Sequence, residues 1–416
     1  MVSSTVMWEP GSSEDEERGD DSAVEDEENN GSSDLAVRGS GFFNWVSQEL
    51  DRRASKAGSR TKPKDKKEIK FCGLQAFTNP YPSGGNLAKK KNVGKDIIYS
   101  VAKPDECGDF SFARRPTSKF STDYKKFSSP WDPDRGFATE HIVEAQLIHQ
   151  FSEDISKSMG EIFLDPYISK NPTRPATKWI ADQYPVNTMW LDEFVLLTGG
   201  VNNVKSRMWN DGTLVDERYI TDPLMGDDFL TMPLKGSKTI NAILRFKDVI
   251  FAYKYHTEPE IERIFKLQID RISTIFGNLD DETKHLDFEQ NANALKKILR
   301  DYKPQELQKK WDKWIKEHTD KSIAKVEDFF NEHYHKYSDT RKRLQKGLQD
   351  AINAAEKEER ENKKKTLNQQ QKKAADAKRE QHKAEKEKYE TVIQYLKDLE
   401  ATYLETMKTK WKNPLK

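Results

Sequence analysis

The sequence contains no long hydrophobic run. No stretch approaches the roughly 18 consecutive apolar residues that a transmembrane helix needs, so no membrane span is expected. Hydrophobic residues make up 35% of the chain, against about 45–50% in a typical globular protein, while charged residues make up 34%. Only part of the 416 residues can therefore surround a hydrophobic core.

Cysteine is also scarce, with Cys72 and Cys107 as its two representatives. They could form one disulfide in a secreted protein or remain free thiols in the cytosol, and the sequence leaves both states open. His333 and His335 are two residues apart, which places them on different faces of a helix, and no further Cys or His follows at the spacing of a zinc site. No metal or cofactor is expected to bind.

Recognisable catalytic motifs are missing as well. The chain has no phosphate-binding GxxxxGK[ST], no dinucleotide-binding GxGxxG and no GxSxG nucleophile elbow. His141 and Glu144, three residues apart, could support proton transfer, but a local polar role at the start of a helix is the stronger interpretation. The carboxylates from Asp211 to Glu217 lie beside Gly212, where a turn is favoured. The chain is therefore expected not to be an enzyme.

The formal net charge is zero, but the charges are separated along the chain. Residues 9–34 contain twelve acidic residues and one basic residue, whereas residues 52–70 contain nine basic and two acidic residues. Because residues 1–70 offer little apolar surface to offset the entropy of ordering, they are expected to form a disordered head. The basic run 52–70 could serve nuclear import or nucleic-acid binding, although an ordinary linker is the favoured interpretation.

The middle of the chain divides into two parts. Residues 71–138 are interrupted repeatedly by Pro and Gly, so we expect an irregular lead-in without a core of its own and one strand at Ile97–Val101. Helical periodicity defines a body over 139–338, in which Thr139 should cap the first helix and Gly199-Gly200 should break or kink the second. The body is expected to be an irregular bundle of five apolar-faced helices that begin near residues 139, 190, 240, 261 and 307.

Residues 339–416 are expected to form a long charged helical tail. Residues 341–416 contain 21 basic and 13 acidic residues. Residues 356–388 combine strong helix formers with almost no apolar side chains, which predicts a solvated helix without a sustained coiled-coil seam. Apolar positions return from Tyr389 to Trp411, and this segment should either project to a partner, dimerisation included, or turn back onto the body.

Three segments of the body carry familiar motifs: residues 139–146 (TEHIVEAQ), residues 192–205 (DEFVLL, then VNNVK) and residues 310–329 (KWDKW, then AKVEDF). Together they resemble the module that follows the catalytic domain in fungal class V, killer-toxin-like chitinases of glycoside hydrolase family 18 and that also occurs as a stand-alone fungal protein. The resemblance covers about residues 71–335. Two departures matter, because Gly199-Gly200 interrupts a helix expected to be continuous in the module, and the chitinase motif DxxDxDxE is absent. The resemblance therefore implies a fungal origin and an accessory role without chitinase activity.

These patterns lead to three hypotheses. The favoured one is a non-enzymatic accessory protein that presents its charged tail to a protein partner. The second is a secreted cell-wall or toxin-associated protein beside a chitinase-like enzyme, with carbohydrate or cell wall as its ligand. The third is a nuclear protein that uses the run 52–70, although the mixed charges and missing aromatics of 356–388 argue against nucleic acid. Residues 1–10 lack the features of a signal peptide, which favours an intracellular protein, whereas the resemblance implies an extracellular one.

Overall fold

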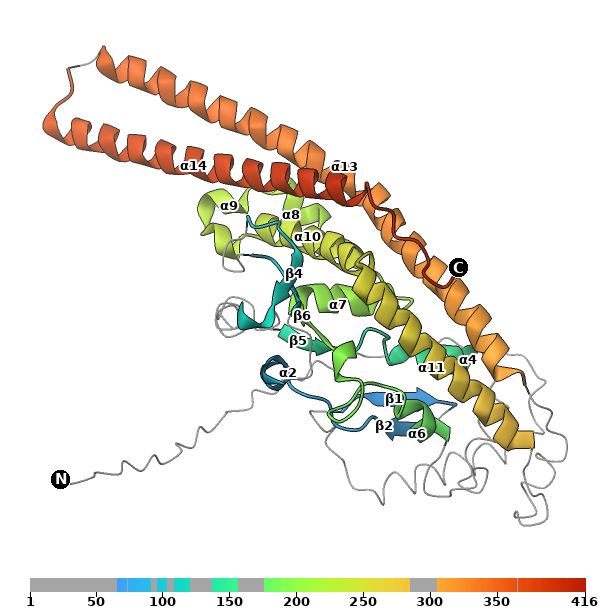
Figure 1. The fold of residues 1–416 in the computed structure, drawn as a ribbon. Helices are drawn as coiled ribbons and strands as arrows, with labels where there is room; N and C mark the ends of the chain where they lie inside the picture. Colours follow the sequence, from blue (N-terminus) through green and yellow to red (C-terminus); the bar gives the residue numbers. More distant parts are fainter. Residues whose placement is uncertain are drawn as a thin grey trace, which may run out of the picture. The chain divides into compact units, whose positions relative to one another are not determined.

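The computed structural model describes residues 66–72, 74–90, 96–102, 108–119, 137–155, 176–284, 305–364 and 366–416. Within these ranges 68% of residues are helical, in ten α-helices, and six short strands form two small sheets. The prediction of a mainly α fold with a long charged C-terminal helix is therefore confirmed (Figure 1). The predicted head lies outside the described residues, except for its last five.

The two sheets are built mostly from the segment that was expected to be irregular. The first is a hairpin of β1 (Glu68–Phe71) and β2 (Leu74–Phe77), so the last residues of the predicted disordered head form a strand. The second has the strand order β4-β3-β6-β5, in which β3 and β6 are parallel and the other neighbours antiparallel. Its strands, which include the one predicted near residue 97, are β3 (Asp96–Ser100), β4 (Ala113–Pro116), β5 (Phe137–Glu140) and β6 (Val195–Thr198).

The first part of each of the first two predicted helices is wrong, because a strand lies there. Thr139 does not cap a helix but lies in β5, where it pairs with Leu196, and α4 (Gln146–Asp154) begins seven residues later. Residues 195–198, predicted as helix, form β6 and are all buried. A short apolar run has neither helical nor strand periodicity, so its pairing with β3 and β5 decides its conformation.

Gly199-Gly200 marks a change from strand to helix rather than a break within a helix. α7 (Gly199–Met208) begins directly after β6, and the carboxylate of Asp248 lies against its first turn. A Cβ on Gly200 would lie 2.5 Å from Asp248 Oδ2. A side chain there would displace the carboxylate that faces the positive end of the helix dipole.

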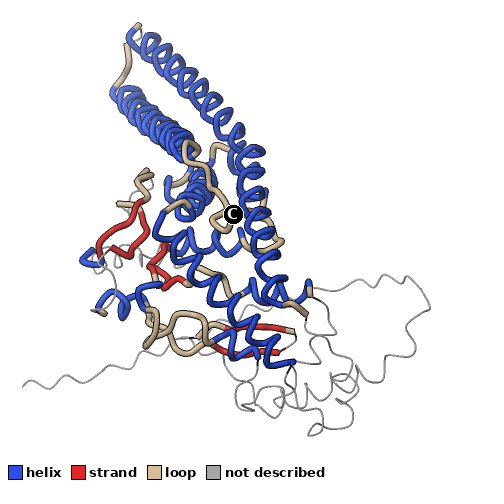
Figure 2. The backbone as a smooth tube through the Cα atoms, turned by 45° about the vertical axis from the view of Figure 1, so that its right-hand side comes forward, coloured by secondary structure: helices blue, strands red, loops and turns tan. Residues whose placement is uncertain are grey.

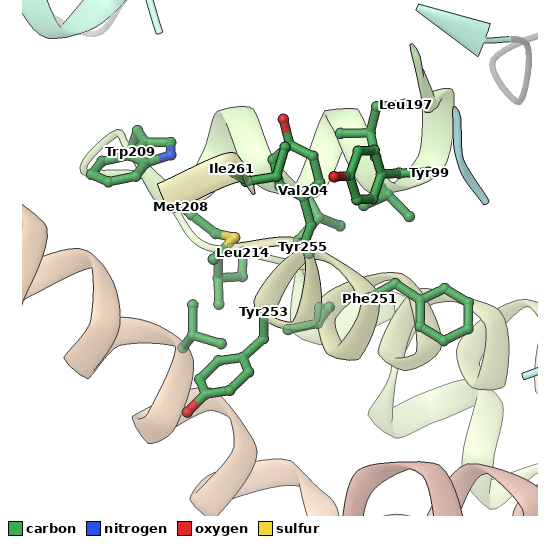
Figure 3. Close-up of a cluster of buried hydrophobic side chains, with 14 of the residues drawn as sticks. Tyr99, Leu197, Val204, Met208, Trp209, Leu214, Phe251, Tyr253, Tyr255 and Ile261 are labelled. Atoms are coloured by element: carbon green, nitrogen blue, oxygen red, sulfur yellow. The ribbon is translucent and has the colours of Figure 1, made fainter. Parts of the chain in front are cut away.

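The central helix of the body is α10 (Lys238–His256), as its apolar sequence predicts. Fifteen of its 19 residues are buried, and Ser237 caps it by accepting a hydrogen bond from the Ile240 N–H. Figure 3 shows its aromatic side chains Phe251, Tyr253 and Tyr255 among apolar residues of neighbouring segments. The predicted fourth and fifth helices are confirmed as α11 and α13, which pack against each other. Their bounds and those of the remaining short helices are α11 (Pro259–Lys284), α13 (Leu307–Lys363), α2 (Gly84–Lys89), α6 (Ala176–Ala181), α8 (Thr221–Met225) and α9 (Asp228–Thr231).

The tail forms a helical hairpin rather than one helix. α13 ends at Lys363, and α14 (Gln369–Thr406) returns beside it in the opposite direction (Figures 1 and 2). Asn368 starts the second helix, because its side chain accepts from the Gln371 N–H while the Gln371 side chain accepts from the Asn368 N–H. This capping box explains why the helix predicted over 356–388 is divided.

The last apolar segment returns to the body. The inward side chains of α14 between Tyr389 and Leu399 are buried. Beyond the helix, the ring of Trp411 stacks on that of His256 with a centroid distance of 4.6 Å, and its backbone N–H donates a 2.7 Å hydrogen bond to Tyr253 Oη. Of the two outcomes that the sequence left open, the structure shows that residues 389–411 fold back.

Candidate functional site

The first segment of the resemblance supplies most of a buried ionic cluster, which we define as Glu140, His141, Glu144 and Lys205. Lys205 is 0% exposed, and its Nζ donates hydrogen bonds to a carboxylate oxygen of Glu140, to the His141 carbonyl (2.9 Å) and to Glu144 Oε1 (3.0 Å). Burial alone lowers the pKa of Lys205, but the two carboxylates outweigh it, so this pKa is raised and the side chain stays charged. The cluster therefore fastens β5 to α7.

A second polar network joins the same segment to α11. Arg271 donates to both carboxylate oxygens of Glu193, at 2.5 and 2.6 Å, and its guanidinium lies 3.8 Å from the centroid of the Trp190 ring. Gln268 donates to Glu193 and accepts a 3.0 Å hydrogen bond from the Val143 N–H. The structure thus brings residues 139–146 and 192–205 together through a layer of buried hydrogen bonds.

The geometry of the ionic cluster favours a structural role over proton transfer. Glu140 and His141 are each 2% exposed, so a substrate has no direct access to them. His141 Nε2 lies 3.3 Å from the Pro185 carbonyl, and burial lowers the pKa of His141 well below its usual range, which keeps the ring neutral. The carboxylate of Glu144, the proposed proton-transfer partner, is held by Lys205. The partners of His141 and Glu144 are distant in the sequence and α4 begins only at Gln146, so the pair does not have the local polar role at a helix start that the sequence favours.

The other residues considered for chemistry also have local structural roles. His333 is buried with its ring 4.5 Å from that of Phe329, whereas His335 is exposed, so the two occupy different helix faces as predicted. Asn210 Oδ1 accepts a 2.9 Å hydrogen bond from the Gly212 N–H, which confirms the predicted turn. Among the described residues, no group of three or more His, Cys, Asp or Glu side chains could hold a metal ion, and no helix could span a membrane.

The possible disulfide, one of the two states that the sequence leaves open, is not tested, because Cys107 lies outside the described residues. Cys72 follows β1 and is half-buried. Burial raises the pKa of its thiol to about 12, so the thiolate is scarce at neutral pH. The pairing of Cys72 with Cys107 stays a prediction.

An open groove lies between the two helices of the hairpin. We call residues 351–386 the arm. The part of the hairpin closer to the body is the base, which consists of Leu344 on α13 and the inward residues between Tyr389 and Leu399 on α14. Among the described residues between Leu344 and Tyr389 none is buried, whereas the base is closed by apolar side chains. Within the arm the facing positions are mostly alanines and charged residues, with one large apolar residue, Ile352, and the helices enclose a groove of about 600 Å³. Its lining residues are Ala351, Ile352, Ala355, Glu356, Glu358, Glu359, Asn362, Lys363, Ala375, Asp376, Lys378, Arg379, His382, Lys383 and Lys386.

Ion pairs connect the two sides of the arm. Lys378 Nζ lies 2.9 Å from Glu358 Oε1, Arg379 Nη2 lies 2.8 Å from Glu359 Oε1, and His382 Nε2 lies 3.3 Å from Glu358 Oε2. Hydrogen bonds from Lys378 and His382 lower the pKa of Glu358. Sequence reasoning missed this groove, although the capping box at Asn368 with Gln371 was a visible signal that the helix turns back.

Comparison with known proteins supplies no relative from which a function could be transferred: the chain matches no family model, no curated protein and no solved structure. The resemblance to the chitinase-associated module therefore stays a prediction, and the groove of the arm is the feature on which a functional proposal rests.

Proposed function

We propose that this chain is a non-enzymatic accessory protein that acts by binding a protein partner through the arm. The observation that carries the proposal is a change in the residues between the two helices of the hairpin. In the base they are buried apolar side chains, whereas in the arm they are mostly alanines and charged residues around an open groove. A segment of this length in which no described side chain is buried contributes little to the core, so its presence is better explained by binding than by stability.

The composition of the arm suits recognition of a protein rather than of nucleic acid. Its α13 side lines the groove with Glu356, Glu358 and Glu359, while its α14 side contributes Lys378 and Lys383. Phosphates would meet the acidic side as well as the basic one, whereas a polypeptide can offer both charges.

The resemblance adds a second candidate, in which the partner is a chitinase-like enzyme of a fungal cell wall. Supporting it is the placement of the segments 139–146 and 192–205 in the buried networks around Lys205 and Arg271. Signature residues that hold a fold together, rather than face a substrate, are what an accessory module without catalytic activity requires.

The test replaces residues 351–386 by a short Gly-Ser loop and compares in-cell crosslinking of the full chain and this variant. The proposal predicts specific protein adducts for the full chain that disappear in the variant, while the melting temperature changes little. The matched control reverses Lys372 and Lys373 to Glu, because both are exposed on α14 outside the groove. Identical adducts with and without the arm would contradict the proposal.

A further inference from the structure

We infer that the groove of the arm accepts one amphipathic α-helix of a partner protein, which carries a stripe of large apolar side chains, acidic residues along one edge and basic residues along the other. This inference rests on the proposed function, because it names the chemistry of the partner for the same site. It follows from the length, the floor and the charged walls of the groove.

The length of the groove matches about three turns of helix. Its α13 wall runs from Ala351 to Lys363 and its α14 wall from Ala375 to Lys386. At about 1.5 Å per residue these walls are each roughly 17–18 Å long. A partner helix of about twelve residues would cover them and present apolar anchors at i, i+3 or i+4, i+7 and i+11.

The floor of the groove lacks the side chains that fill the base. Ala351, Ile352, Ala355 and Ala375 are half-buried, and three of these four end at Cβ. The equivalent seam in the base is filled by residues such as Leu396, which is 2% exposed. The occupant must therefore bring the large apolar side chains that this part of the hairpin omits.

The two walls carry opposite charge. The α13 wall presents Glu356, Glu358 and Glu359 with one base, Lys363, so it is acidic on balance. The α14 wall is basic on balance, because one acid, Asp376, lies among Lys378, Arg379, Lys383 and Lys386. The ion pairs that now cross the groove join exposed groups, which individually stabilise little and can exchange for contacts with a partner. A helix in the groove is therefore stabilised when its acidic edge lies on α14 and its basic edge on α13.

A second copy of this chain fits the groove poorly. Within the arm, Ile352 and Leu367 are the two large aliphatic side chains in the sequence, and the remaining residues are mostly small, polar or charged. Another arm would thus offer alanines and charges to a groove already lined by alanines and charges, and the space above Ala355 would stay unfilled. A different protein, with leucine-sized anchors, meets the requirement.

The test uses a synthetic helical peptide with a leucine stripe, Glu along one edge and Lys along the other, measured against the full chain by fluorescence anisotropy. The control is a peptide of identical composition in which Glu and Lys alternate along both edges. We expect the segregated peptide to bind at least about tenfold more tightly than the mixed one. Binding should be lost in Ala355→Phe, which fills the groove, and retained in Ala354→Phe, whose side chain is exposed outside the groove lining.

Protein variants test the charge on the walls. Lys378→Glu combined with Lys383→Glu should weaken the segregated peptide about tenfold, whereas Lys372→Glu with Lys373→Glu should leave its affinity unchanged. Equal binding of both peptides, or no binding of either, would overturn the inference. A stable dimer in sedimentation that Ala355→Phe dissociates would also overturn it, because a second copy would then occupy the groove. If neither peptide binds but the crosslinks still depend on the arm, the inference fails and the proposed function stands. If the crosslinks survive deletion of the arm, the proposed function fails.

Discussion

The base and the arm of the hairpin belong to the same two helices, yet they are stabilised in different ways. In the base, α14 buries Val392, Ile393, Leu396 and Leu399 against α13 and the body. In the arm, no described side chain is buried, and ion pairs between exposed groups connect the helices. Helix propensity and ion pairs between the helices therefore support the arm, whereas burial of apolar surface supports the base. The comparison separates a part of the tail that stabilises the fold from a part that is available to a partner.

The largest effect is expected in the body, against which the base packs. Lys205→Met leaves the buried carboxylate of Glu140 and the partly buried carboxylate of Glu144 without their cation, and we expect a loss of about 3–5 kcal/mol in the free energy of unfolding. Urea unfolding followed by far-UV circular dichroism and by tryptophan fluorescence should give one coincident transition. A variant that also carries Glu140→Met should recover part of the loss, and a loss below about 1 kcal/mol for the single change would contradict the assigned role.

The next largest effect concerns the contact that fixes the end of the tail. Trp411 is 4% exposed and packs on His256, Tyr253 and Trp209. Trp411→Ala should lower the free energy of unfolding by about 3–5 kcal/mol, the usual cost of removing a buried aromatic ring. Lys412→Ala, at the exposed neighbouring position, is the control and should change little. Similar stabilities for the two variants would mean that the end of the tail does not belong to the core.

A smaller effect is expected from acid. Burial lowers the pKa of His256 well below its usual range, so the folded chain keeps this ring neutral while the unfolded chain protonates it near pH 6.5. The stability that depends on the neutral ring is present above about pH 6.5 and is lost as the pH falls below it. His256→Phe, which preserves the stacking ring, should reduce the slope of unfolding free energy against pH by about 1 kcal/mol per unit between about pH 6 and pH 5. An unchanged slope would show that His256 does not titrate differently on folding.

The smallest effect belongs to the arm. Lys378→Ala removes an ion pair with Glu358 between exposed side chains, and the melting temperature should shift by no more than about 1 °C. Thermal unfolding of this variant beside Lys372→Ala measures the difference. A shift of several degrees would mean that the arm contributes to the core and would remove the distinction between the two regions.

The long helices could be predicted from sequence because each carries its apolar stripe for many turns. α10 and α11 have this property, and both lie where the periodicity places them. β6 could not be predicted in the same way, since four apolar or β-branched residues in a row fit a buried strand or a helix equally well until their partners are known. Thr139 was assigned to a helix cap for a related reason, because its strand partner Leu196 is far away in the sequence.

The candidate site was harder to predict than the fold. The charged sequence from 356 to 388 correctly indicated exposed helical structure, but the single helix predicted there is two helices. A groove exists only when residues such as Glu358 and Lys378, twenty positions apart, face each other. That arrangement depends on the capping box at Asn368, which changes the direction of the chain. A pattern read along one helix cannot show the space between two.

Hydrogen exchange of the full chain, followed by mass spectrometry, tests the distinction between base and arm most directly. Amides in 389–404 should exchange slowly, at the rate set by unfolding of the body, because the inward side chains of this segment are buried against the body. Amides in 351–364 and 369–386 should exchange many times faster, at rates close to those of an isolated helix, since local fraying exposes them without unfolding the body. Equal protection of the two regions would contradict the account, because the arm would then be part of the core and not a free surface for a partner.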